Sequence, residues 1–108
     1  MGKFIVKMRS NDDYQFSLLA DNGQIVLNSQ GYASKASCLN GVESVKKHSQ
    51  SQDNFESKAA SNGQLFFNLK ASNGQVIGTS QMYSSEDART NGIASVIKNA
   101  HNSAIEEA

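Results

Sequence analysis

The most constraining feature of this chain is that it repeats itself. The phrase NGQ at residues 22–24 returns at residues 73–75, which is 51 positions later (73 − 22 = 51). At this offset residues 3–49 align with residues 54–100 without a gap, and identical residues occur along the whole alignment. Self-similarity at a fixed period indicates a structure assembled from equivalent units. We therefore expect two copies of one supersecondary unit, called repeat one (3–49) and repeat two (54–100).

The two repeats are expected to form a single domain, residues 1–108. Each repeat alone falls in the size range where a hydrophobic core is marginal, whereas 108 residues suffice for one modest core. The polar stretch 49–53 then reads as a linker inside that domain. Residues 101–108 are predicted to extend the second helix, as far as Ile105.

Each repeat reads as three strands followed by a helix. In repeat one, Phe4, Val6 and Met8 alternate with other residues, and the alternation resumes in residues 14–20. This period of two is typical of half-buried strands. A third strand is predicted for residues 24–29.

The turn at Asn22-Gly23 predicts the second hairpin. An Asn-Gly pair favours a two-residue type I′ turn, in which both central residues have positive φ. Such a turn would set Ala20 opposite Ile25 and Leu18 opposite Leu27, so that one face of the hairpin is apolar.

The first hairpin turns at residues 10–13, which are rich in turn-forming side chains. A two-residue loop would oppose Lys7 to Phe16. A three-residue loop, residues 11–13, instead pairs Met8 with Phe16 and Val6 with Leu18, and we therefore predict this loop.

The helices are predicted to begin near Ser34 and, in repeat two, at Ser84, which with Asp87 resembles a capping box. Gly41 and Gly92 fall inside these helices, where glycine costs about 1 kcal/mol relative to alanine. A break in the helix would explain them. We favour a close approach of backbone to backbone, because apolar residues at helical spacing continue across Gly41.

Four motifs of repeat one point to a known family: GKF at residues 2–4, F-x-L-x-A-x-N-G-Q at 16–24, S-Q-G-Y-x-S-K at 29–35 and N-G-V-E-S-V-K-K at 40–47. Together they resemble the YegP-like family of small uncharacterised bacterial proteins, in its duplicated subfamily. The resemblance implies an α+β fold with one six-stranded antiparallel sheet and two helices on one face. It also implies that each helix packs on the strands of the other repeat. The chain would then be a monomer that mimics a dimer of single repeats.

Repeat two departs from the pattern of repeat one at several positions of its expected core. Leu27 is replaced by Gly78, and Val6 and Met8 by Ser57 and Ala59. Gly31 is replaced by Met82. We expect a thinner buried face in repeat two.

Composition excludes several classes of protein. Ten basic residues balance ten acidic ones, so the excess of positive charge typical of phosphate-binding surfaces is missing. The single cysteine, Cys38, allows no intramolecular disulfide and weakly favours a reducing compartment. The start of the chain reads as a strand and not as a signal peptide, and no apolar run is long enough to span a bilayer. We expect a cytoplasmic protein without contact to a membrane.

The sequence offers no catalytic, cofactor-binding or metal-binding constellation. His48 and His101 are not equivalent in the repeat and lack neighbours at metal-ligand spacing. Cys38 lacks an adjacent base and is expected to be an inert, partly buried thiol. Phosphate-binding loops and serine nucleophile elbows are missing as well. The prediction leans against an enzyme and names no cofactor.

Four residues remain as candidates for an interface or a ligand site: Tyr32, Tyr83, Asn40 and Asn91. Each tyrosine lies between the third strand and the helix, where it either fills the corner or presents its hydroxyl at a surface. Each asparagine precedes a helix glycine and either hydrogen-bonds at the crossing or contributes to a site.

Three functions follow, in order of preference. The first is a non-catalytic interaction or scaffold module that binds a protein or peptide across the open face or edge of the sheet. The second is a small-ligand-binding protein or enzyme with a site at the pseudo-twofold axis, where the tyrosine or asparagine pairs converge. The third is a weak nucleic-acid binder that uses the sheet.

Overall fold

The computed structural model describes residues 2–101 and 103–108. Its elements follow the predicted order of three strands and a helix, twice, with one further strand at the end. They are β1 (Lys3–Met8), β2 (Tyr14–Leu19), β3 (Ile25–Asn28), α1 (Lys35–His48), a 3₁₀ turn η1 (Gln52–Asn54), β4 (Phe55–Ala59), β5 (Leu65–Lys70), β6 (Val76–Thr79), α2 (Glu86–Ala100) and β7 (Ala104–Glu107).

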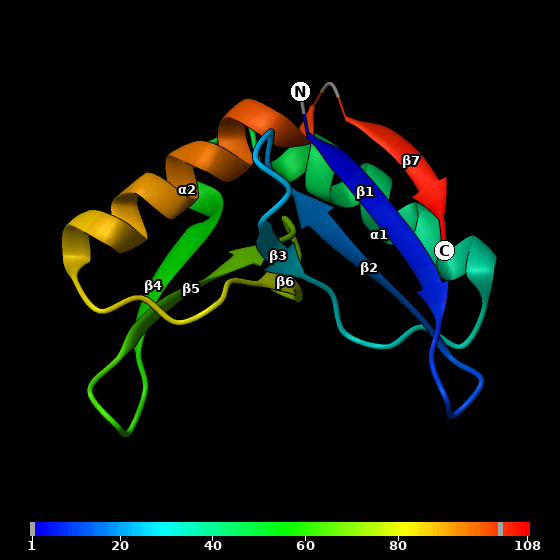
Figure 1. Cartoon of the computed structure of the whole chain (residues 1–108), viewed down its shortest axis with the longest axis horizontal. Coiled ribbons are helices and arrows are strands. Elements are labelled where there is room, and N and C mark those ends of the chain that lie inside the picture. Colours follow the sequence, from blue (N-terminus) through cyan, green and yellow to red (C-terminus); the bar gives the residue numbers. More distant parts are fainter. Residues whose placement is uncertain (1, 102) are drawn as a thin grey trace.

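All strands join one mixed sheet in the order β4-β5-β6-β3-β2-β1-β7 (Figure 1). The repeats meet at its centre, where Asn28 of β3 pairs with Thr79 of β6. The first six strands are antiparallel to their neighbours, but β7 lies parallel to β1. The prediction of a six-stranded antiparallel sheet is therefore wrong in two respects: the sheet has seven strands in the described part of the chain, and the strand at one edge is parallel to its neighbour.

The last strand also corrects the predicted helical extension 101–108. Helix α2 ends at Ala100, and Ala104–Glu107 returns to the sheet, with Ile105 opposite Phe4. The helical spacing of Ala100 and Ala104 suggested a longer helix. It could not reveal that β1 leaves its outer backbone groups available for pairing, which favours an added strand.

The first hairpin has the predicted loop length but not the predicted position. Its loop is residues 10–12, closed by a hydrogen bond from the Arg9 N–H to the Asp13 carbonyl. Asp12 has a φ of 69°, the left-handed residue that commonly ends a three-residue loop. Val6 consequently faces Phe16. The register differs by two residues, so the apolar face is unchanged, but Met8 lies at the strand end and is 58% exposed.

The second hairpin also has a three-residue loop, residues 21–23, instead of the predicted type I′ turn. Gly23 has a φ of 82°, whereas Asn22 does not have a positive φ. The Ala20 N–H therefore donates to Gln24 and not to Ile25. A β-bulge next to Leu18 then restores the predicted pairing of Leu18 with Leu27.

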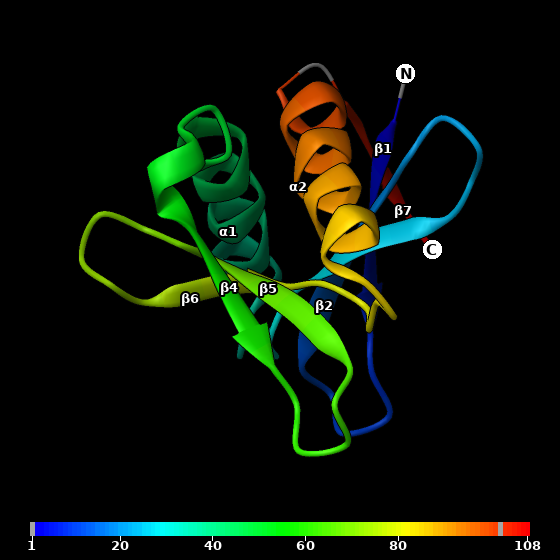
Figure 2. The same cartoon turned by 90° about the vertical axis from the view of Figure 1, so that its left-hand side faces the viewer.

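Both helices lie on the same face of the sheet (Figure 2). Ser34 caps α1 as predicted, and Ser85, one residue after the predicted position, caps α2. Helix α1 contacts β1 and β2 of its own repeat but also β5 and β6. Helix α2 likewise contacts β5 together with β1, β2 and β3. Each helix is therefore shared between the repeats, and the predicted transfer of each helix to the other repeat's strands is too strong a description.

The core lies between the sheet and the two helices, and its best-buried large side chains are Phe4, Phe16, Leu18, Leu27, Phe67 and Leu69. Leu27 explains the glycine at its equivalent position, Gly78. A Cβ built on Gly78 would lie 2.7 Å from the Leu27 Cγ. One large side chain thus fills the space at the centre of the sheet where two would collide.

Candidate functional site

The two candidate tyrosines fill the corners between sheet and helix. Tyr32 stacks on Phe16 with ring centroids 6.1 Å apart, and Tyr83 stacks on Phe67 at 6.2 Å. Their backbones form isolated bridges to Tyr14 and Leu65, which fix the chain as it leaves the sheet. The rings belong to separate halves of the molecule and do not converge on a common site.

The helix glycines are explained by the same corners. A Cβ on Gly41 would lie 2.7 Å from the Tyr32 Cζ, and a Cβ on Gly92 would lie 2.6 Å from the Tyr83 Cζ. The predicted close approach is confirmed, but its partner is an aromatic side chain and not backbone. Burial raises the pKa of both tyrosine hydroxyls, so both hold their protons firmly. Both tyrosines therefore pack in their corners, and Tyr83 also lines a hollow beside α2.

The candidate asparagines are both exposed, but only one of them borders a hollow among those described here. Asn91 lines a hollow of about 310 Å³ and a neighbouring one of about 350 Å³, both between the β2–β3 loop and α2. Asn22 and Ser95 line both hollows, so the two adjoin, and together they are called the groove. Asn40 lines neither of the two.

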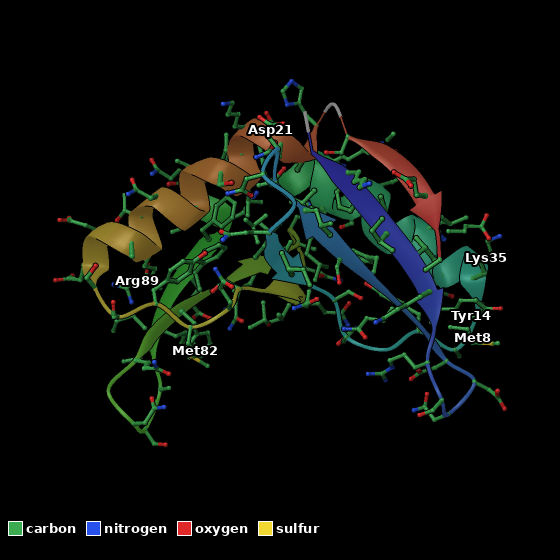
Figure 3. All side chains as sticks on the ribbon, in the orientation of Figure 1. Met8, Tyr14, Asp21, Lys35, Met82 and Arg89 are labelled. Carbon is green, nitrogen blue, oxygen red and sulfur yellow. The ribbon has the colours of Figure 1, made fainter. Side chains whose placement is uncertain are left out.

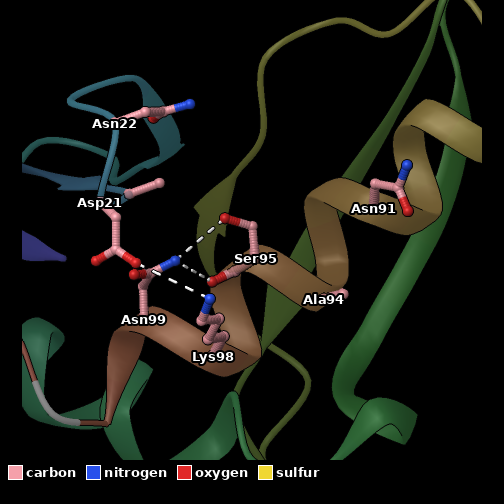
Figure 4. A pocket seen from close by; sticks show the side chains of 8 residues that line it. Asp21, Asn22, Asn91, Ala94, Ser95, Lys98 and Asn99 are labelled. Carbon is pink, nitrogen blue, oxygen red and sulfur yellow. Dashed lines mark hydrogen bonds and ion pairs between the residues drawn. The ribbon is translucent and has the colours of Figure 1, made fainter. Parts of the chain in front are cut away.

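Several polar side chains line the first of these hollows (Figure 4). The Asn99 Nδ2 donates to the Ser95 carbonyl at 2.8 Å and to its Oγ at 3.2 Å, which commits that amide to its own helix. The Lys98 Nζ lies 3.9 Å from Asp21 on the β2–β3 loop. The groove therefore offers amide, hydroxyl and charged groups where repeat one meets α2, but no reactive pair.

The groups with possible catalytic chemistry are inert or dispersed. Cys38 is fully buried, and burial raises the pKa of its thiol. The His48 Nδ1 lies 2.9 Å from the Ser44 carbonyl within α1. Among the described residues there is no group of three or more metal-binding side chains, and neither helix is long and apolar enough to cross a membrane.

The two edges of the sheet differ in a way that the sequence did not predict. At one edge, β7 covers β1, and the Ala108 N–H donates to the Val6 carbonyl at 2.9 Å. At the other edge, β4 occupies the place in repeat two that β1 holds in repeat one, but in the described part of the chain it pairs with β5 alone. Figure 1 shows these two edges at opposite ends of the molecule.

The outer side of β4 presents backbone groups to solvent. The Ala60 N–H donates to the Gln64 carbonyl, and the alternation along an antiparallel pair then directs the backbone groups of Glu56 and Lys58 toward β5. Those of Ser57 and Ala59 point outward. Arg89 Nη1 donates to the Lys58 carbonyl at 2.9 Å, on the inward side, so the outward groups stay open.

The equivalent phenylalanines at the covered and the open edge also differ in burial. Phe4, beside β7, is fully buried, whereas Phe55 at the open edge is only partly buried. One sequence signal could have revealed β7. Ile105-Glu106 follows the second helix much as Phe55-Glu56 follows the first, so each copy returns to the sheet after its helix.

Comparison with known families gives a double match to a domain of unknown function, DUF1508, at residues 10–56 and 60–107. The chain belongs to this family. The first DUF1508 segment begins after β1 and ends within β4, and the second begins after β4 and ends with β7. Each therefore contains two strands, a helix and at least the start of the strand that follows. The resemblance to YegP-like proteins and the internal repeat are confirmed.

Relatives of the chain are uncharacterised proteins of the same length class. It is 45% identical to the UPF0339 protein YegP of Yersinia pestis, covering 99% of this chain and 96% of the relative. A UPF0339 protein of Shewanella oneidensis is 43% identical, and its solution NMR structure superimposes with a TM-score of 0.92 over 98% of this chain and 90% of that one. The NMR structure of Escherichia coli yegP, 42% identical, gives 0.93 over 98% and 91%.

Proposed function

We propose that this DUF1508 protein is a non-catalytic interaction module that binds an extended segment of another protein along β4. The observation that carries the proposal is the contrast between the two edges: β1 accepts β7, while the equivalent edge of β4 has no strand beside it in the described residues. Addition of a strand to an open edge derives its affinity from main-chain hydrogen bonds. The lone, buried Cys38 suits a cytoplasmic protein, and one chain already contains both repeats, which suits a monomer.

A proline at Ser57 tests this function. The Ser57 N–H points outward, so Ser57→Pro removes a donor needed by an added strand but none that β4 gives to β5. A displayed library of random peptides is selected on the wild-type protein, and each enriched peptide is then measured against Ser57→Pro and its matched control, Ser57→Ala. We expect peptides that bind the wild type and Ser57→Ala equally and lose binding to Ser57→Pro. Binding that survives Ser57→Pro, or no enrichment, would contradict the proposal.

The groove beside α2 supports a second candidate function, the binding of a small polar ligand. The proposed site includes Asn91, one of the predicted candidates, next to Tyr83, Asn22 and Ser95. A thermal-shift screen of small metabolites tests it, since a ligand of the folded state raises the melting temperature. Hits should be lost in Ser95→Phe, which fills the groove. Weak nucleic-acid binding on the sheet ranks third because the chain has no net charge.

A further inference from the structure

We propose that the segment bound at β4 runs parallel to β4 and carries an apolar residue followed, two positions later, by a basic one. This inference rests on the proposed function and adds the direction and the chemistry of the partner. It is derived by comparison of β4 with β1, whose edge is already occupied in the same molecule.

The direction comes from the pairing of β1 with β7. These strands are parallel, with Lys3 opposite Ala104 and Val6 opposite Glu107. At the repeat offset of 51, β1 corresponds to residues 54–59, which include all of β4. Both strands pair antiparallel with the next strand of their own repeat, so they present the same alternation of outward groups. A strand seated on β4 in the same way would begin opposite Asn54.

The apolar position comes from the phenylalanines. Ile105 lies opposite Phe4, and Phe4 is fully buried. At the open edge the equivalent Phe55 packs edge-on against Phe67, with centroids 5.6 Å apart, but remains partly exposed. A segment that places an apolar side chain opposite Phe55 covers the remaining ring surface.

The basic position comes from a reversal of charge between the repeats. Glu107 lies two positions after Ile105, and its Oε1 forms an ion pair with the Lys35 Nζ at the start of α1. The residue equivalent to Lys35 in repeat two is Glu86, at the start of α2. In a segment with the register of β7, the residue two positions after the apolar one would come close to Glu86, where a lysine or arginine attracts and a glutamate repels. Figure 3 shows Lys35 and Arg89 at the two opposite ends of the molecule, each beside its own edge.

Other charges near this edge leave Glu86 available. Arg89 Nη2 is 3.8 Å from Glu86, but the Arg89 side chain is 14% exposed and its Nη1 is bound to the Lys58 carbonyl. The Glu86 side chain is 84% exposed. On the other face of β4, Glu56 is already paired with Lys70 at 3.1 Å and lies 3.7 Å from Lys58. We therefore predict no preferred residue type for the position between the apolar and the basic residue of the segment.

The same reversal discourages a second copy of this chain. A β7 strand donated by another molecule would place its Glu107 near Glu86, and like charges at this distance destabilise the pairing. The open edge therefore prefers a foreign basic segment to the chain's own acidic strand.

Two matched peptides test the charge. One has the sequence of residues 103–108, SAIEEA, and the other, SAIEKA, differs only at the position of Glu107; both have blocked ends. Each is titrated to millimolar concentration into ¹⁵N-labelled protein, and the amide shifts of Ser57 and Ala59 are followed. SAIEKA should bind about two- to fivefold more tightly than SAIEEA, the range of one exposed ion pair. Glu86→Lys should reverse the order, whereas the control Lys35→Glu at the occupied edge should leave it unchanged.

A spin label on either end of SAIEKA tests the direction. In the parallel arrangement a label on the first residue broadens the amide of Asn54, and one on the last residue broadens that of Ala59. Equal affinity of the two peptides, antiparallel broadening, or shifts outside β4 would overturn this inference. The inference would also be overturned if neither peptide bound while library peptides still lost binding to Ser57→Pro. In each of these cases the proposed function stands, whereas it falls if no binding depends on Ser57.

Discussion

At the scale of single residues, the chain uses one contact twice. Tyr32 and Tyr83 each lie between a core phenylalanine and a helix glycine. The absence of a Cβ at Gly41 and Gly92 allows the ring to approach the helix backbone. Residues that look like site candidates in the sequence are therefore explained by packing.

Gly41→Ala should destabilise the protein although alanine favours a helix. The gain in helix propensity is about 1 kcal/mol, whereas overpacking against Tyr32 costs about 1–3 kcal/mol. We expect a lower urea midpoint, and partial recovery when Tyr32→Phe removes the hydroxyl nearest to the new methyl group. Asn40→Ala, at the exposed neighbouring position, serves as control and should not lower the midpoint. Greater stability of Gly41→Ala would show that the corner has free space.

The buried tyrosines should also make stability decline at alkaline pH. Their pKa is higher in the folded state than in the unfolded chain, so the folded state binds their protons more firmly. This contribution is complete below the ordinary tyrosine pKa of about 10 and is lost as the pH rises through the raised pKa. Urea unfolding between about pH 8 and pH 11 measures the decline. It should be shallower in a Tyr32→Phe/Tyr83→Phe variant; identical slopes would contradict the assignment.

At the scale of elements, the informative difference lies between two equivalent strands. β1 is covered by β7, with a surface ion pair between Lys3 and Glu106 at 3.1 Å, whereas β4 is open. β4 is also the less apolar strand, as the replacements at Ser57 and Ala59 predicted, and these two residues are exposed. An open edge of this composition is suited to reversible pairing more than to a permanent core.

Amide hydrogen exchange should distinguish the two edges. The Val6 amide lies between β1 and β7, while the outward amides of Ser57 and Ala59 face solvent. We expect Ser57 and Ala59 to exchange much faster than Val6, because protection follows local hydrogen bonding. Ile105→Asp should weaken β7 and accelerate Val6 without affecting Ser57. Slow exchange at Ser57 and Ala59 would indicate that their edge is covered.

At the scale of the whole molecule, two similar halves form one sheet that is not symmetric. The halves meet at β3 and β6, where Leu27 fills the space above Gly78. Each helix spans strands of both repeats, so neither half buries its core alone. Duplication in one chain lets equivalent positions diverge, and this freedom allowed both the Leu27–Gly78 pair and the unequal edges.

Exchanging the two central residues tests this complementarity. Truncation of a buried leucine to alanine costs about 2–5 kcal/mol, and Leu27→Gly should lower the free energy of unfolding by at least this amount. Gly78→Leu should lower it by about 1–3 kcal/mol through overpacking. The double variant should recover much of the loss, because contacting sites are not additive. Additive losses in a double-mutant cycle would contradict the shared space.

Much of the architecture could be predicted from local patterns. The repeat, the order of strands and helices, the hairpins and the helix start at Ser34 all follow from periodicity and turn chemistry over short distances. The exact registers could not, because a loop at Asp12 or a bulge near Leu18 changes the pairing without changing which face is apolar. Of the site candidates, Tyr32 and Tyr83 pack between sheet and helix, and Tyr83 and Asn91 border the groove.

What the sequence alone determined is the repeated unit, because its strands, turns and helix depend on residues close together in the chain, and the need for one shared core, because each unit is too short to bury a core alone. Only the tertiary structure decided what residues 104–107 do and which edge stays open. A short segment such as Ala104–Glu107 has little conformational preference of its own, and its pairing with β1 depends on backbone groups about a hundred residues away (104 − 3 = 101). β7 covers the edge at β1, and in the described residues no strand covers the equivalent edge at β4. This open edge is the surface on which we expect the partner to bind.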